Sequence, residues 1–200
     1  MICYLLTRVT HGQGTVTLTL QKAEDEPAKV PGERLFLTER SYEKLGAPRK
    51  GTILSEESAE ALRTAHRRYE AVRRATSILA YADNSEAMLL HKLRARKIRS
   101  EDAAFARAYV KAKGLIRERD QLERLVTRLA NEKLYGRSRI LRALCGKGYR
   151  AADIEACIDA LCADGTLDFD CIKRTLLEKK APKDGLERKK LLYTHGFGEY

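Results

Sequence analysis

Three segments of the sequence share one pattern, and their spacing limits the possible folds more than any other feature. Each segment has a Leu five residues before a closing Ile, Tyr or Phe, with basic or small residues between them, at residues 90–98, 141–149 and 189–197. The closing residues lie 51 and 48 positions apart, so the repeat is about 50 residues long. Repetition at such a period is typical of proteins built from stacked supersecondary units.

Each repeat unit is expected to read helix, helix, turn, helix. The pattern ends a helix at a cap, and the closing apolar residue folds back onto the helix it has just left. Asp102 and Asp153 lie four residues beyond the first two closing positions, in the opening turn of the next helix. Such units cover their apolar faces by stacking, so we predict tandem three-helix, helix-turn-helix-like repeats in an elongated curved array. A single compact helical bundle, with segments similar by chance, is the alternative.

Two of the repeats depart from the common pattern. Lys97 stands where the other copies have Gly148 and Gly196, so the first cap is expected to differ in geometry. The third unit is expected to be incomplete here, because a further helix would begin after its closing residue, Phe197, and the given sequence has three residues beyond it.

The residues before the repeats have the period of strands. Val16, Leu18 and Leu20 alternate with threonines, residues 2–6 alternate before a glycine-containing turn, and residues 34–38 are a third candidate strand. From Ser55 onward the period is helical, and one apolar stripe is expected along the first helix: Leu62, Ala65, Tyr69, Val72, Thr76 and Leu79. We therefore predict a mainly α protein that begins with a small antiparallel β module. The predicted domains are 1–54 (β module), 55–116 (linker helix and first repeat), 117–166 (second repeat) and 167–200 (incomplete third repeat).

The distribution of charge predicts an anionic partner. The chain has 39 Lys and Arg against 28 Asp and Glu, a net charge of +11. Residues 88–150 carry 18 basic and 6 acidic side chains, whereas residues 151–170 carry 6 acidic and no basic ones. Clustered cations bind phosphates or carboxylates, although basic faces that are merely solvated are the alternative. No helix can be singled out for reading bases. The candidate binding residues are Arg94, Lys97, Arg99, Lys111, Lys113, Arg137, Arg139, Arg142, Lys147 and Arg150.

Several functional classes find no support in the sequence. The four histidines are scattered without a catalytic or metal-binding spacing, and no catalytic carboxylate pair can be argued. The five cysteines form no CxxC pair and are expected to be free thiols of a reducing compartment, with Cys157 and Cys162 buried. No apolar run approaches the roughly 20 residues that span a bilayer. We predict no enzymatic activity, catalytic residue, metal site or cofactor, and a cytoplasmic monomer.

The repeated motif resembles that of a known family. L-x-x-L-x-x-[KR]-[GK]-[IYF], recurring at about 50 residues in a basic helical chain, is similar to the RecX family, modulators of the RecA recombinase. The order of segments around it also resembles that family: SILAY at 77–81, then the motif helix, then FARAYVK at 105–111. The stretch with LFL at 35–37 and LSEE at 54–57 is similar to the β region of longer members.

The resemblance implies a function. A RecX-like protein binds the RecA filament on DNA, its curved repeats lodging in the filament groove, and inhibits ATP hydrolysis and strand exchange. The basic residues would then meet acidic RecA side chains or the DNA phosphate backbone. The alternatives are a general DNA-binding helix-turn-helix module or transcription regulator, and a structural adaptor that binds its partner through the β module.

Overall fold

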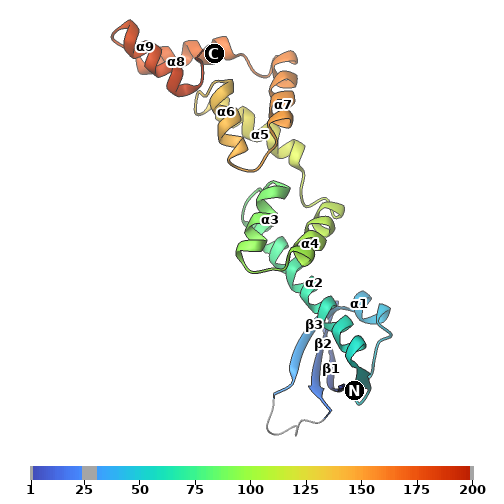
Figure 1. Cartoon of the computed structure of the whole chain (residues 1–200). Helices are drawn as coiled ribbons and strands as arrows, with labels where there is room; N and C mark the ends of the chain where they lie inside the picture. Colours follow the sequence, from blue (N-terminus) through green and yellow to red (C-terminus); the bar gives the residue numbers. More distant parts are fainter. Residues whose placement is uncertain (1, 24–30, 199–200) are drawn as a thin grey trace. The chain divides into compact units, whose positions relative to one another are not determined.

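A small antiparallel sheet comes first in the chain and helices follow it (Figure 1). The computed structural model describes residues 2–23 and 31–198. The strands are β1 (Cys3–His11), β2 (Thr15–Lys22), β3 (Glu33–Thr38) and β4 (Ile53–Ser55). The helices are α1 (Glu39–Lys44), α2 (Glu56–Tyr81), α3 (Glu86–Ala95), α4 (Ser100–Ala112), α5 (Glu118–Asn131), α6 (Arg137–Cys145), α7 (Ala151–Ala163), α8 (Phe169–Lys180) and α9 (Gly185–His195). The prediction of a mainly helical fold that begins with an antiparallel β module is confirmed.

The chain divides into two compact units, which are described separately. The first unit comprises Met1–Ile78 and Leu93–Val110, and the second comprises Leu79–Lys92 and Lys111–Tyr200. Helices α2, α3 and α4 therefore each contribute residues to both units. The domain boundaries derived from the repeat stay a prediction.

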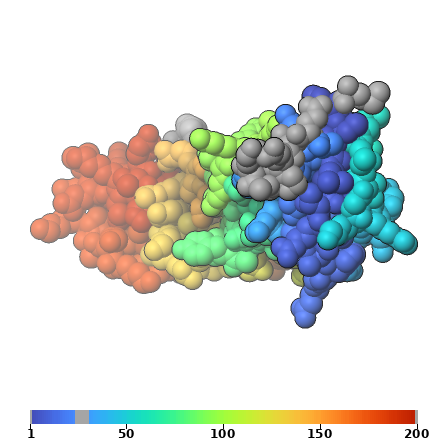
Figure 2. Space-filling model, turned by 90° about the horizontal axis from the view of Figure 1, so that it is seen from below, coloured from blue at the N-terminus to red at the C-terminus, as the bar shows by residue number. Residues whose placement is uncertain are grey.

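The sheet of the first unit has one strand more than the sequence predicted. Its order is β3-β2-β1-β4 with antiparallel neighbours, and the added strand β4 pairs Ser55 with Cys3. The predicted hairpin joins β1 and β2, where Gly14 adopts a φ of 71° that favours glycine. One face of the sheet buries apolar side chains under the start of α2, whose Leu62 is 2% exposed. Figure 2 shows the blue strands beside the cyan and teal residues of α1 and early α2.

The apolar stripe predicted along α2 is wrong in the second half of the helix. Leu62 is buried as expected, but beyond it the buried residues are Ala71, Ala75 and Ile78, while the predicted Thr76 is exposed. The two halves of α2 have different surroundings. The residues up to Ala65 pack on the sheet, whereas from mid-helix the neighbour is α4, where the buried carboxylate of Asp102 lies 3.7 Å from the Arg67 Nε. One straight stripe cannot serve both halves.

All three motif caps have the same backbone geometry, which corrects the expectation that the first would differ. Lys97, Gly148 and Gly196 have φ angles of 61°, 82° and 84°. In each copy the backbone N–H of the closing residue donates to the carbonyl of the Leu five positions earlier, at 3.2, 3.2 and 2.9 Å. This bond is the hallmark of a Schellman cap. Lys97 adopts the left-handed conformation although it has a Cβ, so the repeat extends to its backbone hydrogen bonds.

The second unit is organised around an apolar core drawn from α5 to α8. Val126, Ile140, Ile154, Ile158 and Leu176 are fully buried in it. The second closing residue, Tyr149, belongs to this core, and the third, Phe197, packs against it. Asp184 caps the start of α9, because its carboxylate accepts from the Glu187 N–H at 2.7 Å. The motif residues thus pack as the repeat pattern predicts.

Candidate anion-binding site

Within the second unit, the caps of successive repeats pack on the start of the preceding motif helix. At the first such junction the Ser85 hydroxyl, just before α3, donates to the Lys147 carbonyl at 2.8 Å. A Cβ added to Gly148 would lie 2.9 Å from the Ser85 Oγ and 3.3 Å from the Met88 N. Glycine is required here by this close approach as well as by its φ angle.

The second junction has a similar arrangement one repeat later in the sequence. Gly136, which is 51 positions after Ser85, lies just before α6, and its N–H donates to the His195 carbonyl at 2.7 Å. The His195 Nδ1 lies 3.0 Å from the Leu134 carbonyl. A Cβ added to Gly196 would fall 2.5 Å from the Arg139 N. The end of α9 is therefore fixed on the turn that precedes α6.

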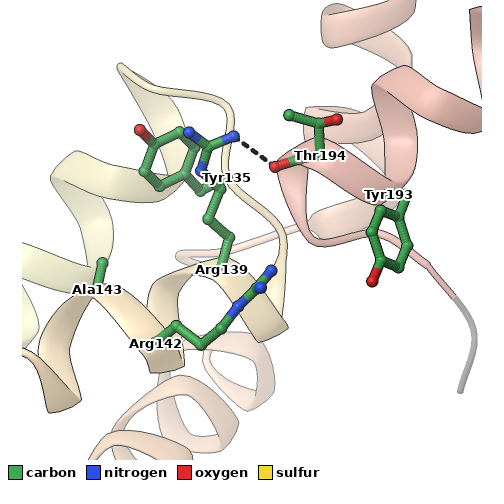
Figure 3. A pocket seen from close by; sticks show the side chains of 6 residues that line it. All are labelled: Tyr135, Arg139, Arg142, Ala143, Tyr193 and Thr194. Carbon is green, nitrogen blue, oxygen red and sulfur yellow. Dashed lines mark hydrogen bonds between the residues drawn. The ribbon is translucent and has the colours of Figure 1, made fainter.

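An open hollow of about 640 Å³ lies beside this second junction, and we call it the α6–α9 hollow. Its lining, within residues 2–23 and 31–198, combines two guanidinium groups and two tyrosines and has no acidic residue: Tyr135, Arg139, Arg142, Ala143, Tyr193 and Thr194. Arg139, Arg142 and Ala143 share one face of α6, because positions three and four apart on a helix are neighbours. Figure 3 shows Arg142 extending from α6 toward the side of the hollow that carries Tyr193.

The two arginines of the hollow differ in how firmly they are held. The Arg139 guanidinium stacks 4.1 Å from the centre of the Tyr135 ring and donates to the Thr194 carbonyl (Figure 3). Arg142 is exposed, and its Nε donates to the Ser138 carbonyl of its own helix at 3.4 Å. Arg139 therefore contributes a fixed charge and Arg142 an accessible one. Planar guanidinium groups bind phosphate or carboxylate through paired hydrogen bonds.

The other predicted binding residues are spread over both units. Arg94, Lys97 and Arg99 belong to the first unit and are exposed. In the second unit Lys113, Lys147 and Arg150 are exposed as well. The structure thus brings only Arg139 and Arg142 together in one hollow.

Two predicted residues already have acidic partners. The Lys111 Nζ lies 2.6 Å from a Glu86 carboxylate oxygen, and Arg137 lies 2.7 Å from Asp159. Both members of the Arg137 pair are largely exposed, whereas Glu86 is only 18% exposed, so an anionic partner would compete at little cost for Arg137 and less easily for Lys111. Asp159 belongs to the acidic stretch at 151–170, which therefore partly neutralises the basic segment.

Sequence reasoning missed the tyrosines of the hollow. Tyr135 and Tyr193 lie 58 positions apart, and only the contact between α9 and the turn before α6 brings them together. The available signal was the stacking of repeats, since Tyr135 precedes one motif helix and Tyr193 ends the next.

A second hollow, of about 410 Å³, lies beside the first junction, and we call it the α3–α5 hollow. Lys147 lines it together with two basic residues that were not predicted, Lys92 and Arg128. Its charge is partly offset, because Asp83 lines it as well. The Lys92 Nζ donates to the Asn84 Oδ1 at 2.5 Å.

Tyr149 forms part of the wall of the α3–α5 hollow. Its hydroxyl donates to the Gln121 Oε1 at 3.2 Å. Burial, with smaller effects of Glu118 and Asp83, raises the pKa of Tyr149 from 10.0 to about 12. The phenol is therefore held neutral over the physiological range.

Other chemistry finds no place in the described residues. Across 2–23 and 31–198, no three His, Cys, Asp or Glu side chains gather as a metal site would need. The same residues include no helix that is long and apolar enough to cross a membrane. All five cysteines are free thiols; Cys157 and Cys162 are half-buried rather than buried, because the α7 face that carries them meets the core only partly.

Comparison with known proteins identifies the fold. No protein-family profile and no curated protein sequence matches the chain. Among solved structures, one described as regulatory protein RecX matches with a TM-score of 0.74 at 18% identity, covering 98% of this chain and 95% of its own. RecX from Lactobacillus salivarius matches with a TM-score of 0.55 at 18% identity, covering 66% of this chain and 89% of its own. The resemblance seen in the motif is thus confirmed as a shared fold.

Proposed function

We propose that the chain is a RecX-type regulatory protein, which binds the RecA filament on DNA and restrains its ATPase and recombinase activity. The observation that carries the proposal is the fold it shares with a RecX structure over 98% of the chain. At 18% identity the fold leaves the binding residues open, and these are proposed from the chain itself. In this proposal the protein acts without catalysis or a cofactor, as a monomer in the cytoplasm.

The exposed cations of the basic segment support an anionic partner. Arg94, Lys97 and Arg99 in the first unit, and Arg142, Lys147 and Arg150 in the second, all present their side chains to solvent. Junctions that repeat at about 50 residues distribute these cations along the chain, and this distribution suits a partner that itself repeats. Acidic RecA side chains and DNA phosphate would both meet them favourably.

The test is the effect of the protein on the DNA-dependent ATPase of RecA. We expect inhibition when the protein is scarce relative to RecA, at a salt concentration that abolishes its binding to naked DNA. Inhibition under these conditions separates filament binding from general DNA binding, because the electrostatic binding of DNA alone weakens steeply with salt. No inhibition at equimolar protein would contradict the proposal.

Charge reversal locates the binding surface. The triple variant Arg142→Glu, Lys147→Glu, Arg150→Glu should raise the concentration for half-inhibition at least tenfold, because several close charge pairs are replaced by repulsion. These three residues are preferable to Arg137 and Arg139, which hold other parts of the protein.

A matched control changes the net charge equally on the β module. Lys22, Arg34 and Arg40 are exposed and lie outside the basic segment. Their reversal to Glu should leave inhibition nearly unchanged. If both triple variants lose inhibition equally, the effect belongs to net charge and the assigned residues are wrong.

A further inference from the structure

We propose that the α6–α9 hollow binds single-stranded nucleic acid, with a phosphate held by Arg142 and an unstacked base lying on Tyr193. The inference deepens the proposed function, since a protein that acts on DNA-bound filaments meets exposed single strands. The recognition of phosphate and base nevertheless depends only on the residues that line the hollow.

The Arg142 side chain is not required by the junction that forms the hollow, because its Nε donates to the Ser138 carbonyl of its own helix. Each junction ties a cap carbonyl to the turn before a motif helix, through the Ser85 hydroxyl at the first and the Gly136 N–H at the second. Tyr135, Arg139 and Arg142 nevertheless stand where the first junction has Asn84, Met88 and His91. A buried position between them keeps its character, as Leu89 and Ile140 are both fully buried. Arg139 and Tyr135 hold the junction through the Thr194 carbonyl and their stacking, but neither this contact nor the apolar packing accounts for Arg142.

The cations of the hollow are prepared for a phosphate. Arg139 is fixed by its stacking on Tyr135 and its bond to the Thr194 carbonyl, so its charge is in place before a ligand arrives. Arg142, one helical turn later on the same face of α6, keeps an exposed guanidinium. Among the described residues that line the hollow none is acidic, in contrast to Asp83 in the α3–α5 hollow. Among these described residues a phosphate would therefore meet two positive charges without a competing carboxylate.

The aromatic ring distinguishes nucleic acid from an acidic peptide. Tyr193 is 73% exposed and stands on α9, across the hollow from Arg142 (Figure 3). An exposed aromatic ring beside guanidinium groups offers a base both a stacking surface and a partner for its phosphate. Duplexes hide the faces of their bases, so this combination selects single strands.

The experiment measures binding of a fluorescein-labelled oligothymidylate by anisotropy, without RecA. Arg142→Ala should reduce the slope of log K against log salt by about 0.7, as expected for one lost phosphate contact on a single strand. Tyr193→Leu should weaken binding roughly tenfold and leave the salt slope unchanged, whereas Tyr193→Phe should bind as the parent does.

Matched controls are available in the same unit. Arg128 lines the α3–α5 hollow, and Tyr81 is 93% exposed outside both hollows. Arg128→Ala and Tyr81→Leu should each leave oligonucleotide binding close to that of the parent. Equal losses in the control and test variants would overturn the site.

Two competition experiments complete the test. We expect a duplex of the same length, and a polyglutamate peptide, to displace the oligothymidylate only weakly at equal charge. Displacement by polyglutamate as effective as that by single strands would overturn the proposal and assign the hollow to an acidic protein surface. Because RecA is absent, oligonucleotide binding can succeed while the ATPase test fails, or the reverse.

Discussion

The substitution Gly148→Ala tests whether the junction between repeats depends on a close backbone approach. Gly148 has a φ of 82°, and an added Cβ would lie 2.9 Å from the Ser85 Oγ, 3.2 Å from the Ala87 Cβ and 3.3 Å from the Met88 N. The matched control is Gly165→Ala after α7, where φ is 79° but nothing lies within 4 Å of the added Cβ. The two substitutions share the conformational strain and differ in the contact.

The expected magnitudes follow from these two parts. The left-handed conformation costs a residue with a Cβ about 1 kcal/mol, and this is the whole expected effect of Gly165→Ala. At Gly148 the Ser85 hydroxyl must move and loses its bond to the Lys147 carbonyl, for about 1 kcal/mol. Displacing the backbone of α3 adds about 1 kcal/mol of overpacking. We therefore expect Gly148→Ala to lower the free energy of unfolding by about 3 kcal/mol.

Urea denaturation followed by circular dichroism measures both free energies. The m-values should match that of the parent, so that the shifts in midpoint report stability. In the double variant Ser85→Ala, Gly148→Ala the losses should be less than additive, because the Oγ that meets the new Cβ is gone. Equal effects of Gly148→Ala and Gly165→Ala, within about 0.5 kcal/mol, would refute the close approach as the reason for glycine.

Three further outcomes are expected from the remaining features. Lys97→Gly should stabilise the protein by about 0.5 kcal/mol in urea, because relief of left-handed strain exceeds the added chain entropy; a loss of stability would contradict the cap. Because the pKa of Tyr149 is raised to about 12, its contribution to stability is complete below pH 10.0 and is lost as pH rises toward 12; a tyrosine titration should show this late step in the parent and not in Tyr149→Phe. Burial raises the pKa of the Cys157 thiol, so a maleimide should label it more slowly than the exposed Cys145 and Cys171, and equal rates at all three would be inconsistent with its burial.

The repeat was the most predictable part of the fold. The spacing of Leu and closing residues located each motif cap, and the closing residues Tyr149 and Phe197 lie in or on the core. The geometry of the cap at Lys97 was predicted wrongly because the glycines of the other two caps were interpreted only as a sign of a positive φ angle. In the structure Gly148 and Gly196 each lie close against the preceding motif helix, so glycine at these positions permits contact between successive repeats.

Elements defined by distant partners could not be predicted. β4 has three residues and exists through its pairing with β1, about 50 positions earlier, so no local period indicates it. The buried face of the second half of α2 was not predicted either, because its Ala71 and Ala75 are too small to form a visible apolar stripe in the sequence.

The candidate site was predictable as a region and not as a geometry. Charge counting found the basic segment, but it could not tell Arg142, which is exposed at a hollow, from Arg137, which pairs with Asp159 22 positions away. Tyr193 lies outside the basic segment altogether and joins the site only because α9 contacts the turn before α6.

The junction between repeats also bears on how such chains change length during evolution. Each junction joins two unlike surfaces: the glycine cap of one repeat and the start of the motif helix of the repeat before it. A unit of about 50 residues carries one surface of each kind, so duplication of that segment in frame supplies both new contacts at once. Deletion of a whole unit likewise leaves matching surfaces to meet. We therefore expect relatives of this fold to gain and lose entire units more readily than they tolerate insertions inside the caps.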